Sequence, residues 1–175
     1  MQLARDALQA HFAGRAEPPL PDAPAAALRR GAFVTLLRQG ALRGCIGHVA
    51  DDRPLGDVVR EMAVAAALDD PRFPPVTPDE LPALTIEVSV LTQPVRLASA
   101  GPDAPRVVVG RDGLIVRRGQ HIGLLLPQVA TEYHWGPEAF LAATCRKAGL
   151  PPEAWREPET ELLAFQADVF GGQQE

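Results

Sequence analysis

The alternation of apolar and polar residues between Leu84 and Thr92 constrains the fold more than any other feature of the sequence. The apolar side chains occupy every second position, at Leu84, Ile86, Val88 and Val90. Successive side chains of a β-strand point to opposite faces, so one face of this strand is core and the other is polar. A sheet with one polar face is typical of antiparallel proteins. Glu87 therefore points into solvent or into a cleft.

Other segments predict a mixture of helices and strands. Apolar residues at helical spacing predict helices over 2–13, 54–69 and 137–147, and Thr77-Pro78-Asp79-Glu80 has the capping-box pattern of a single helical turn. Strands are predicted over 32–39, 42–49, 84–92, 106–110, 114–117, 122–126 and 161–170. The first two of these form a hairpin with a turn at Gly40-Ala41. The expected fold is α+β, a mostly antiparallel sheet with flanking helices in one compact unit.

Length and proline content favour a single domain over residues 1–175. A chain of 175 residues is near the size of one large domain. The 18 prolines cluster in short stretches, which predicts rigid connections between elements. The sequence has no internal repeat and no linker long enough to separate two independent domains.

Charge and cysteine content exclude several classes of partner. The net charge is −5 and no run of Lys or Arg exceeds two residues, whereas a surface that follows nucleic-acid phosphates needs clustered cations. No apolar stretch reaches the roughly 20 residues that span a bilayer, and the N-terminus lacks a signal-peptide core. Cys45 and Cys145, 100 residues apart, make no disulfide framework. We expect a cytoplasmic protein without membrane or nucleic-acid partners.

The segment Leu42-Arg43-Gly44-Cys45-Ile46-Gly47-His48 is the candidate functional centre. In a strand, Arg43, Cys45 and Gly47 share one face. A cation beside a thiol favours the thiolate, which is both a nucleophile and a soft metal ligand. The alternatives are that Cys45 is a small buried hydrophobe and that Arg43 forms an ordinary surface ion pair.

Glycines and polar residues around this segment suggest ligand contacts. Gly44 and Gly47 mark the close approach of a ligand or of another backbone. Arg72, in the stiff loop 70–75, either grips a carboxylate or phosphate or pairs with an acid of the chain. His48 has metal-ligand spacing from Cys45, but the two side chains point to opposite faces of a straight strand, so no metal site is predicted.

Two glutamates are candidates for acid–base chemistry. Glu87 and Glu132 either share a cleft or are solvated surface residues. Three histidines are further candidates for acid–base or metal work: His48, His121 and His134. The sequence lacks a phosphate-binding glycine loop, a GxGxxG motif and a GxSxG elbow, which disfavours ATP hydrolysis, dinucleotide redox chemistry and α/β-hydrolase chemistry.

A series of motifs resembles the AMMECR family, also called protein A of the AmmeMemoRadiSam system. The motifs follow the family order from about residue 30 to 150: FVTL (33–36), LRGCIG (42–47), DPRFPPV (70–76), EL..L.IEVSVL (80–91), GRDGLIV (110–116), GLLLPQVA (123–130), the region around Glu132 and Trp135, and FLAATCRKAGL (140–150). The resemblance implies a larger and a smaller lobe, with LRGCIG beside the cleft between them. It also implies a Memo-like and a radical SAM partner, but no established reaction and no assigned cofactor.

Two functional hypotheses follow. In the first, the protein is a small enzyme, or a catalytic subunit of a Memo/radical SAM modification system. Cys45 is then the nucleophile or thiolate, Arg43 tunes it or binds an anion, and Glu87 or Glu132 is the acid or base. In the second, the protein is a non-catalytic adaptor that presents a small molecule or peptide to the same partners.

Overall fold

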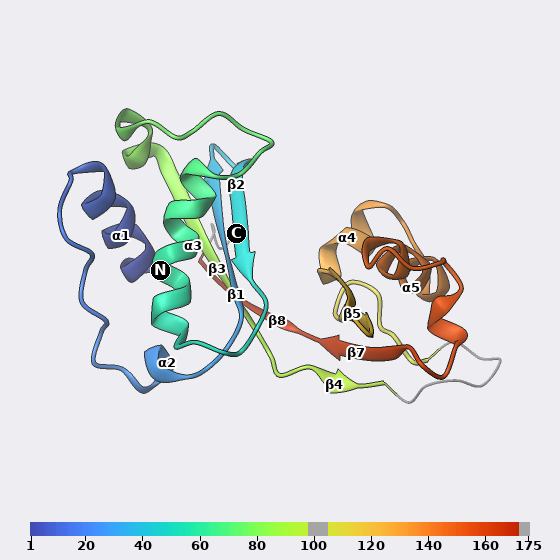
Figure 1. The fold of residues 1–175 in the computed structure, drawn as a ribbon. Helices are drawn as coiled ribbons and strands as arrows, with labels where there is room; N and C mark the ends of the chain where they lie inside the picture. The colour runs from blue at the N-terminus through green and yellow to red at the C-terminus, as the bar shows by residue number, and fades with distance from the viewer. Residues whose placement is uncertain (98–104, 172–175) are drawn as a thin grey trace. The chain divides into compact units, whose positions relative to one another are not determined.

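The computed structural model describes residues 1–97 and 105–171, which form two compact units (Figure 1). Unit 1 comprises Met1–Leu91 with Asp168–Glu175, and unit 2 comprises Thr92–Ala167. Each unit has one sheet of four strands and its own helices. The predicted α+β class with antiparallel sheets is confirmed.

The sheet of unit 1 has the strand order β2-β1-β3-β8. Its strands are β1 (Ala32–Arg38), β2 (Ala41–His48), β3 (Leu84–Leu91) and β8 (Ala167–Gly171). The predicted hairpin of β1 and β2 is confirmed, with its turn one residue earlier than expected. Gln39 and Gly40 both have positive φ, 52° and 78°, as a two-residue hairpin turn of type I′ requires. Strand β2 lies at the edge of this sheet.

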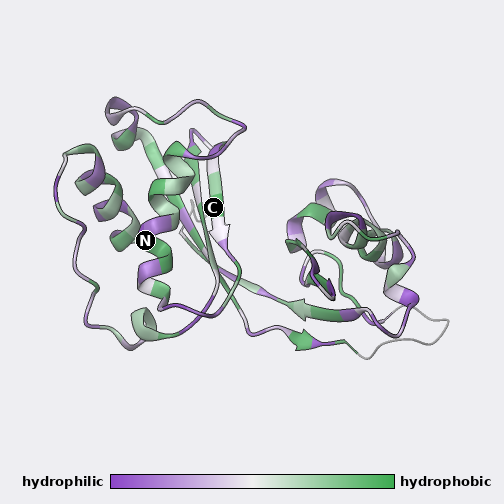
Figure 2. Cartoon of the chain, in the orientation of Figure 1, coloured by the Kyte–Doolittle hydropathy of each residue, from purple (hydrophilic) through white to green (hydrophobic). Residues whose placement is uncertain are grey.

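Helices α1 (Gln2–Phe12) and α3 (Leu55–Leu68) contribute to the core of unit 1. Both carry apolar and polar residues, and the banding is visible in Figure 2. In the core, Val58 and Ala63 of α3 pack with residues at alternate positions of β1 and β3. These strand residues include Val34, Leu36, Ile86 and Val88. The opposite positions of these strands, such as Thr35 and Glu87, therefore lie on the face of the sheet away from α3. We call this the open face.

Unit 1 also contains two short helical segments. The four-residue helix α2 (Pro24–Ala27) lies in a proline-containing stretch for which no helix is predicted from the sequence. The 3₁₀ helix η1 (Pro78–Ala83) begins with the predicted capping box of Thr77 and Glu80. Within residues 1–97 and 105–171, no helix combines the length and apolar character that crossing a bilayer requires.

The sheet of unit 2 has the strand order β4-β7-β5-β6. Its strands are β4 (Val95–Arg96), β5 (Gly113–Arg118), β6 (His121–Leu125) and β7 (Glu161–Phe165). The helices are α4 (Pro127–Glu132), α5 (Pro137–Lys147) and the 3₁₀ helix η2 (Ala154–Arg156). The core contains Leu114, Phe140, Leu141, Trp155 and Leu162.

Two strand predictions in this region were wrong. Residues 106–110 form no strand. The Val108 N–H donates to the Asp112 carboxylate, and the Val108 carbonyl accepts from the Asp112 N–H. Because the tight turn uses these backbone groups, they are not available for hydrogen bonds to a neighbouring strand. The single strand predicted over 161–170 is two strands separated by Gln166, with β7 in the sheet of unit 2 and β8 in the sheet of unit 1.

Candidate functional site

Cys45 lies on the open face of unit 1, in the edge strand β2. Its side chain is partly buried, and the Thr35 hydroxyl donates a hydrogen bond to the sulfur at 3.2 Å. Thr35 is the cross-strand partner of Cys45 on one side and of Glu87 on the other. The three residues therefore form a row across β2, β1 and β3, with sulfur, hydroxyl and carboxylate on the same face.

The spacing of this row limits what its members can do together. Adjacent strands lie about 4.8 Å apart, so the Cα atoms of Cys45 and Glu87 are separated by about 10 Å. A substrate or water seated over Thr35 has the sulfur on one side and the carboxylate on the other. The row can thus hold a nucleophile and an acid or base without direct contact between them.

The backbone of Cys45 is fastened by the Asp70–Arg72 pair. The Cys45 N–H donates to Asp70 Oδ2 at 2.8 Å, and the Cys45 carbonyl accepts from Arg72 Nη2 at 3.4 Å. Arg72 also binds the Asp70 carboxylate through Nε and Nη2, at 3.0 and 2.8 Å. The Asp70 side chain is only 3% exposed. The arginine, with backbone N–H donors of Cys45 and Arg72, holds the pKa of Asp70 well below its usual range.

Arg43 is bound to Glu80 and not to the sulfur of Cys45. Its Nε and Nη2 each lie 2.9 Å from one carboxylate oxygen of Glu80, and its Nη1 donates to the Pro74 carbonyl at 2.9 Å. The hydrogen bonds from Arg43, helped by the Thr77 N–H, lower the pKa of Glu80 to about 2. The positive charge of Arg43 is therefore compensated by the carboxylate of Glu80.

Both glycines of the central segment have close neighbours within unit 1. A Cβ at Gly44 would lie 2.0 Å from the carbonyl oxygen of Ala66 in α3. A Cβ at Gly47 would lie 2.2 Å from the ring of Phe33 on the neighbouring strand. Gly44 therefore allows the close approach of another backbone, one of the two explanations suggested by the sequence. Gly47 instead leaves room for an aromatic ring.

The predicted histidine and glutamate candidates lie in different places. His48 pairs with Asp52 at 2.7 Å through Nε2, a contact that lowers the pKa of Asp52. Glu132 is the exposed last residue of α4, in unit 2, whereas Glu87 belongs to unit 1. His121 Nδ1 lies 3.2 Å from the Ala148 carbonyl. His134 is exposed with φ of 52°.

The second cysteine is a packing residue. Cys145 is completely buried in the core of unit 2, and burial raises the pKa of its thiol. No group of three His, Cys, Asp or Glu side chains with metal-binding geometry occurs among the residues that the structure describes.

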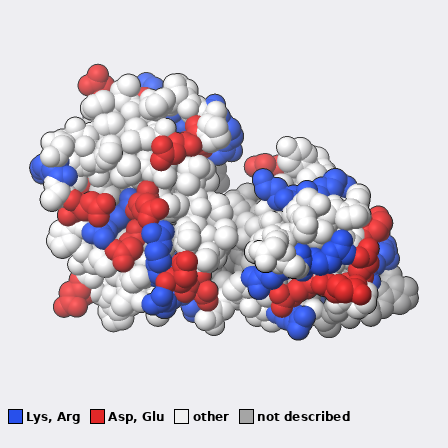
Figure 3. Space-filling view, viewed as in Figure 1, with Lys and Arg blue, Asp and Glu red and all other residues white. Residues whose placement is uncertain are grey.

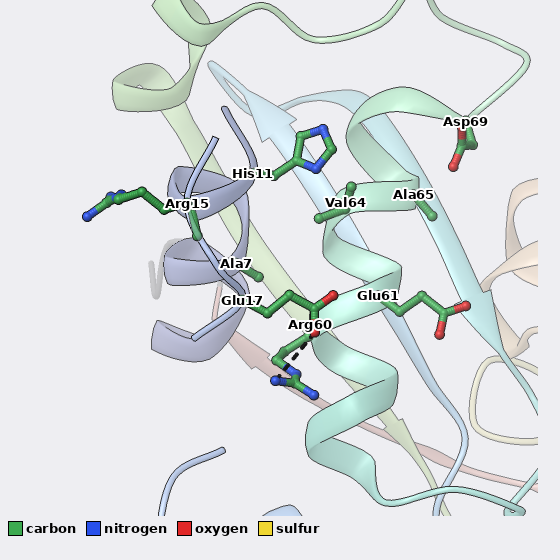
Figure 4. Close-up of a pocket in the computed structure, with 10 residues that line it drawn as sticks. Ala7, His11, Arg15, Glu17, Arg60, Glu61, Val64, Ala65 and Asp69 are labelled. Carbon is green, nitrogen blue, oxygen red and sulfur yellow. Dashed lines mark ion pairs between the residues drawn. The ribbon is translucent and has the colours of Figure 1, made fainter. Parts of the chain in front are cut away.

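A separate pocket of about 280 Å³ in unit 1 is lined by α1, α3 and the segment that follows α1 (Figure 4). Arg60 of α3 closes its lower side through an ion pair to Glu17 at 3.5 Å and a hydrogen bond to the Pro18 carbonyl at 2.8 Å. None of the predicted site residues lines it. On the face shown in Figure 3, acidic and basic side chains are interleaved in both units.

Three residues that organise the Cys45 site were not predicted from the sequence. Asp70 belongs to the loop 70–75, in which only Arg72 is a predicted site residue, and Glu80 is predicted only as part of a capping box. Thr35 becomes a neighbour of the sulfur through the hairpin register. The turn at Gln39 and Gly40 alone would pair Thr35 with Gly44, but the register shifts by one residue between Leu36 and Leu37 and brings Thr35 opposite Cys45.

Comparisons with known proteins agree with the motifs. The AMMECR1 family model matches residues 1–170. The chain is 51% identical to a protein of Methanothermobacter thermautotrophicus, over 97% of this chain and 91% of that protein. It is 48% identical to one of Thermococcus gammatolerans, over 97% and 87%. The crystal structure of an uncharacterised Pyrococcus horikoshii protein matches with a TM-score of 0.85 at 43% identity, covering 98% of this chain and 89% of that one. The predicted resemblance is confirmed, and the chain belongs to the AMMECR1 family.

Proposed function

We propose that the open face of unit 1 is a thiol-dependent reaction site with Cys45 as its nucleophile. The observation that carries the proposal is the Thr35 hydroxyl, which donates to the sulfur at 3.2 Å. This hydrogen bond restrains the side chain of Cys45, so the sulfur is oriented on the open face. Thr35, and not Arg43, therefore contacts the sulfur, because Arg43 is bound to Glu80.

Two further contacts support this assignment. The Asp70–Arg72 pair fixes the backbone at Cys45, so the sulfur is held in one position at an otherwise free sheet edge. Glu87 lies in the same row on the open face. In the proposed reaction the sulfur of Cys45 adds to an electrophilic carbon of a substrate double bond. The π electron pair of that bond moves to its other atom, and Glu87 passes the proton given up by the thiol to that atom.

The proposed context is a modification system with a Memo-like protein and a radical SAM protein, as the family resemblance implies. In that system this chain supplies the thiol, and its substrate is a small molecule or a peptide. The proposed location is the cytoplasm, whose reducing conditions keep the thiol free.

Alkylation by iodoacetamide as a function of pH, followed by mass spectrometry of the intact folded chain, tests the thiol. We expect Cys45 to be modified and the buried Cys145 to be protected. Thr35→Val removes the hydroxyl and keeps the shape, so the sulfur loses the contact that orients it and its alkylation should slow across the pH range. Thr85→Val, on the same face of β3, is the matched control. An inert Cys45, or identical profiles for wild type and Thr35→Val, contradicts the proposal.

The second candidate function is a non-catalytic adaptor, and the position of Arg43 favours it. Arg43, bound to Glu80, helps to line an open hollow that a peptide or small molecule can enter, together with Arg38, Phe73, Pro74, Thr77, Asp79 and Glu80. For an adaptor, Cys45→Ser retains partner binding and the activity of the whole system. For the thiol enzyme, Cys45→Ser retains partner binding and abolishes that activity.

A further inference from the structure

The motif Gly110-Arg111-Asp112-Gly113 builds a turn in unit 2 in which three of the four residues have an architectural role. Gly110 has φ of 85°, a conformation that side chains disfavour. The Asp112 carboxylate accepts a hydrogen bond from the Val108 N–H at 2.9 Å. A Cβ at Gly113 would lie 2.3 Å from the ring of Phe165, so the glycine lets that ring pack on the strand. Arg111 remains as the outward-facing member.

Arg111 is held in one orientation by its neighbour. Its Nε and Nη2 donate to the two oxygens of Asp112 at 2.7 and 3.0 Å. The Asp112 side chain is 5% exposed, whereas that of Arg111 is 58% exposed. Gln166 also reaches the Asp112 carboxylate, at 3.4 Å. A guanidinium carries five N–H donors, and within residues 1–97 and 105–171 the Nη1 group of Arg111 has no hydrogen-bond partner.

Beside this arginine is a hollow of about 380 Å³ whose lining residues all belong to unit 2 and include members of β4 and β7 and of the turn. The residues that line it are Thr92, Gln93, Val95, Leu97, Arg106, Arg111, Asp112, Ala164, Phe165 and Gln166. Val95, one of the apolar residues of the lining, is 68% exposed. One wall is therefore apolar and accessible.

The charged residues of the hollow are two arginines and one aspartate. The aspartate is already neutralised by Arg111, so the hollow keeps one uncompensated positive charge in a chain with a net charge of −5. That charge belongs to Arg106, which is exposed and forms no ion pair with any residue that the structure describes. The lining also includes the amide side chains of Gln93 and Gln166.

We propose that this hollow binds a small oxyanion that carries an apolar group, namely a carboxylate or phosphate on an aliphatic or aromatic substituent. Arg106 and the free edge of Arg111 bind the anionic group, because planar guanidinium groups match carboxylate and phosphate oxygens. Val95 and Leu97 contact the apolar group. Asp112 is a positioning residue that keeps Arg111 pointed at the ligand. The site is independent of Cys45 and of the function proposed for it.

The test uses three soluble probes with the full chain, N-acetyl-leucine, its neutral analogue N-acetyl-leucinamide, and isobutyl phosphate. Binding is measured by NMR titration of the ¹⁵N-labelled protein, which gives both the affinity and the residues affected. We expect the two anions, or one of them, to shift the amides of residues 106, 111, 112 and 166, and the amide analogue to bind at least roughly tenfold more weakly. The preferred anion identifies the ligand as a carboxylate or a phosphate.

Arg106→Gln is the decisive variant, because Arg106 is exposed and its loss leaves the core unchanged. We expect it to weaken anion binding roughly 10- to 100-fold, the effect of losing one charged hydrogen-bonding partner. Arg146→Gln, an exposed arginine on α5 outside the hollow, should leave binding unchanged. Equal binding of the amide analogue, shifts elsewhere in the chain, or an Arg106→Gln variant with wild-type affinity overturns the proposal.

Discussion

The backbone N–H of Cys45 donates a hydrogen bond to the carboxylate of Asp70 at 2.8 Å, on the side of β2 where no further strand pairs. An edge strand leaves such groups without a ladder partner. Here Asp70 accepts from the N–H and Arg72 donates to the carbonyl of the same residue. A charged pair from the loop after α3 therefore replaces a neighbouring strand at the one position that carries the thiol.

Removal of Asp70 should loosen the backbone at Cys45 specifically. In Asp70→Ala the Cys45 N–H loses its acceptor, so we expect its hydrogen exchange to accelerate at least roughly tenfold. The Ile46 N–H faces β1, because inward and outward groups alternate along an antiparallel strand, and should change less. Amide exchange measured by NMR checks this, with Asp69→Ala as the control at an adjacent exposed aspartate. Equal acceleration at residues 45 and 46 would indicate general destabilisation instead.

The Arg43–Glu80 pair should make stability depend on acidity. The folded-state pKa of Glu80 is about 2, below its ordinary value of 4.5. The stabilisation is therefore fully present above pH 4.5 and is lost as the pH falls toward 2. Glu80→Gln should lower the free energy of unfolding by about 1–3 kcal/mol at pH 7 and by progressively less below pH 4.5.

Urea unfolding at pH 7, 4 and 3 measures this difference. Asp79→Asn is the matched control, since Asp79 lies exposed in the same 3₁₀ helix and forms no ion pair within the described residues. It should change the free energy of unfolding by less than about 1 kcal/mol. A Glu80→Gln effect that stays constant from pH 7 to pH 3 would show that the pair does not act through its charge.

Gly44→Ala should be strongly destabilising, because the added Cβ would lie 2.0 Å from the Ala66 carbonyl and backbone cannot give way as a side chain can. Overpacking of this kind costs about 1–3 kcal/mol or more. Gly47→Ala should cost less, since it meets the movable ring of Phe33. Gly136→Ala meets no atom within 4 Å and should be tolerated. Thermal unfolding followed by circular dichroism gives the order, and a stable Gly44→Ala variant would refute the close helix–strand contact.

Thr160→Val should stabilise the protein or leave its stability unchanged. Thr160 is 1% exposed, and its hydroxyl has no hydrogen-bond partner among the described residues. A buried hydroxyl without a partner costs about 1–3 kcal/mol. Thr144→Val is the matched comparison, because the buried Thr144 hydroxyl donates to the Phe140 carbonyl at 2.8 Å and its removal loses that bond. Denaturant midpoints should rise or hold for the first variant and fall for the second; the reverse order would indicate an unseen partner for Thr160.

The elements that could be predicted were those whose signal is local. Leu84–Leu91 alternates cleanly and forms β3, and the Thr77–Glu80 capping box begins η1. The prediction failed at 106–110, where β-type residues surround an aspartate that captures a backbone N–H. The sequence also predicted a single strand in place of β7 and β8, because nothing local to Gln166 indicates that the chain passes from one sheet to the other.

The sequence by itself determined which residues share a face of each strand: it placed Glu87 on the polar face of its strand and Cys45 on the same face as Arg43 and Gly47. Periodicity does this because side-chain direction is fixed within the strand. Only the tertiary structure decided their neighbours. Arg43 lies two residues from Cys45 but binds Glu80, 37 residues away, and the sulfur receives its hydrogen bond from Thr35. Charges and hydrogen-bonding groups pair with whichever partner folding brings within about 3 Å, and that distance is set by the packing of segments remote in sequence.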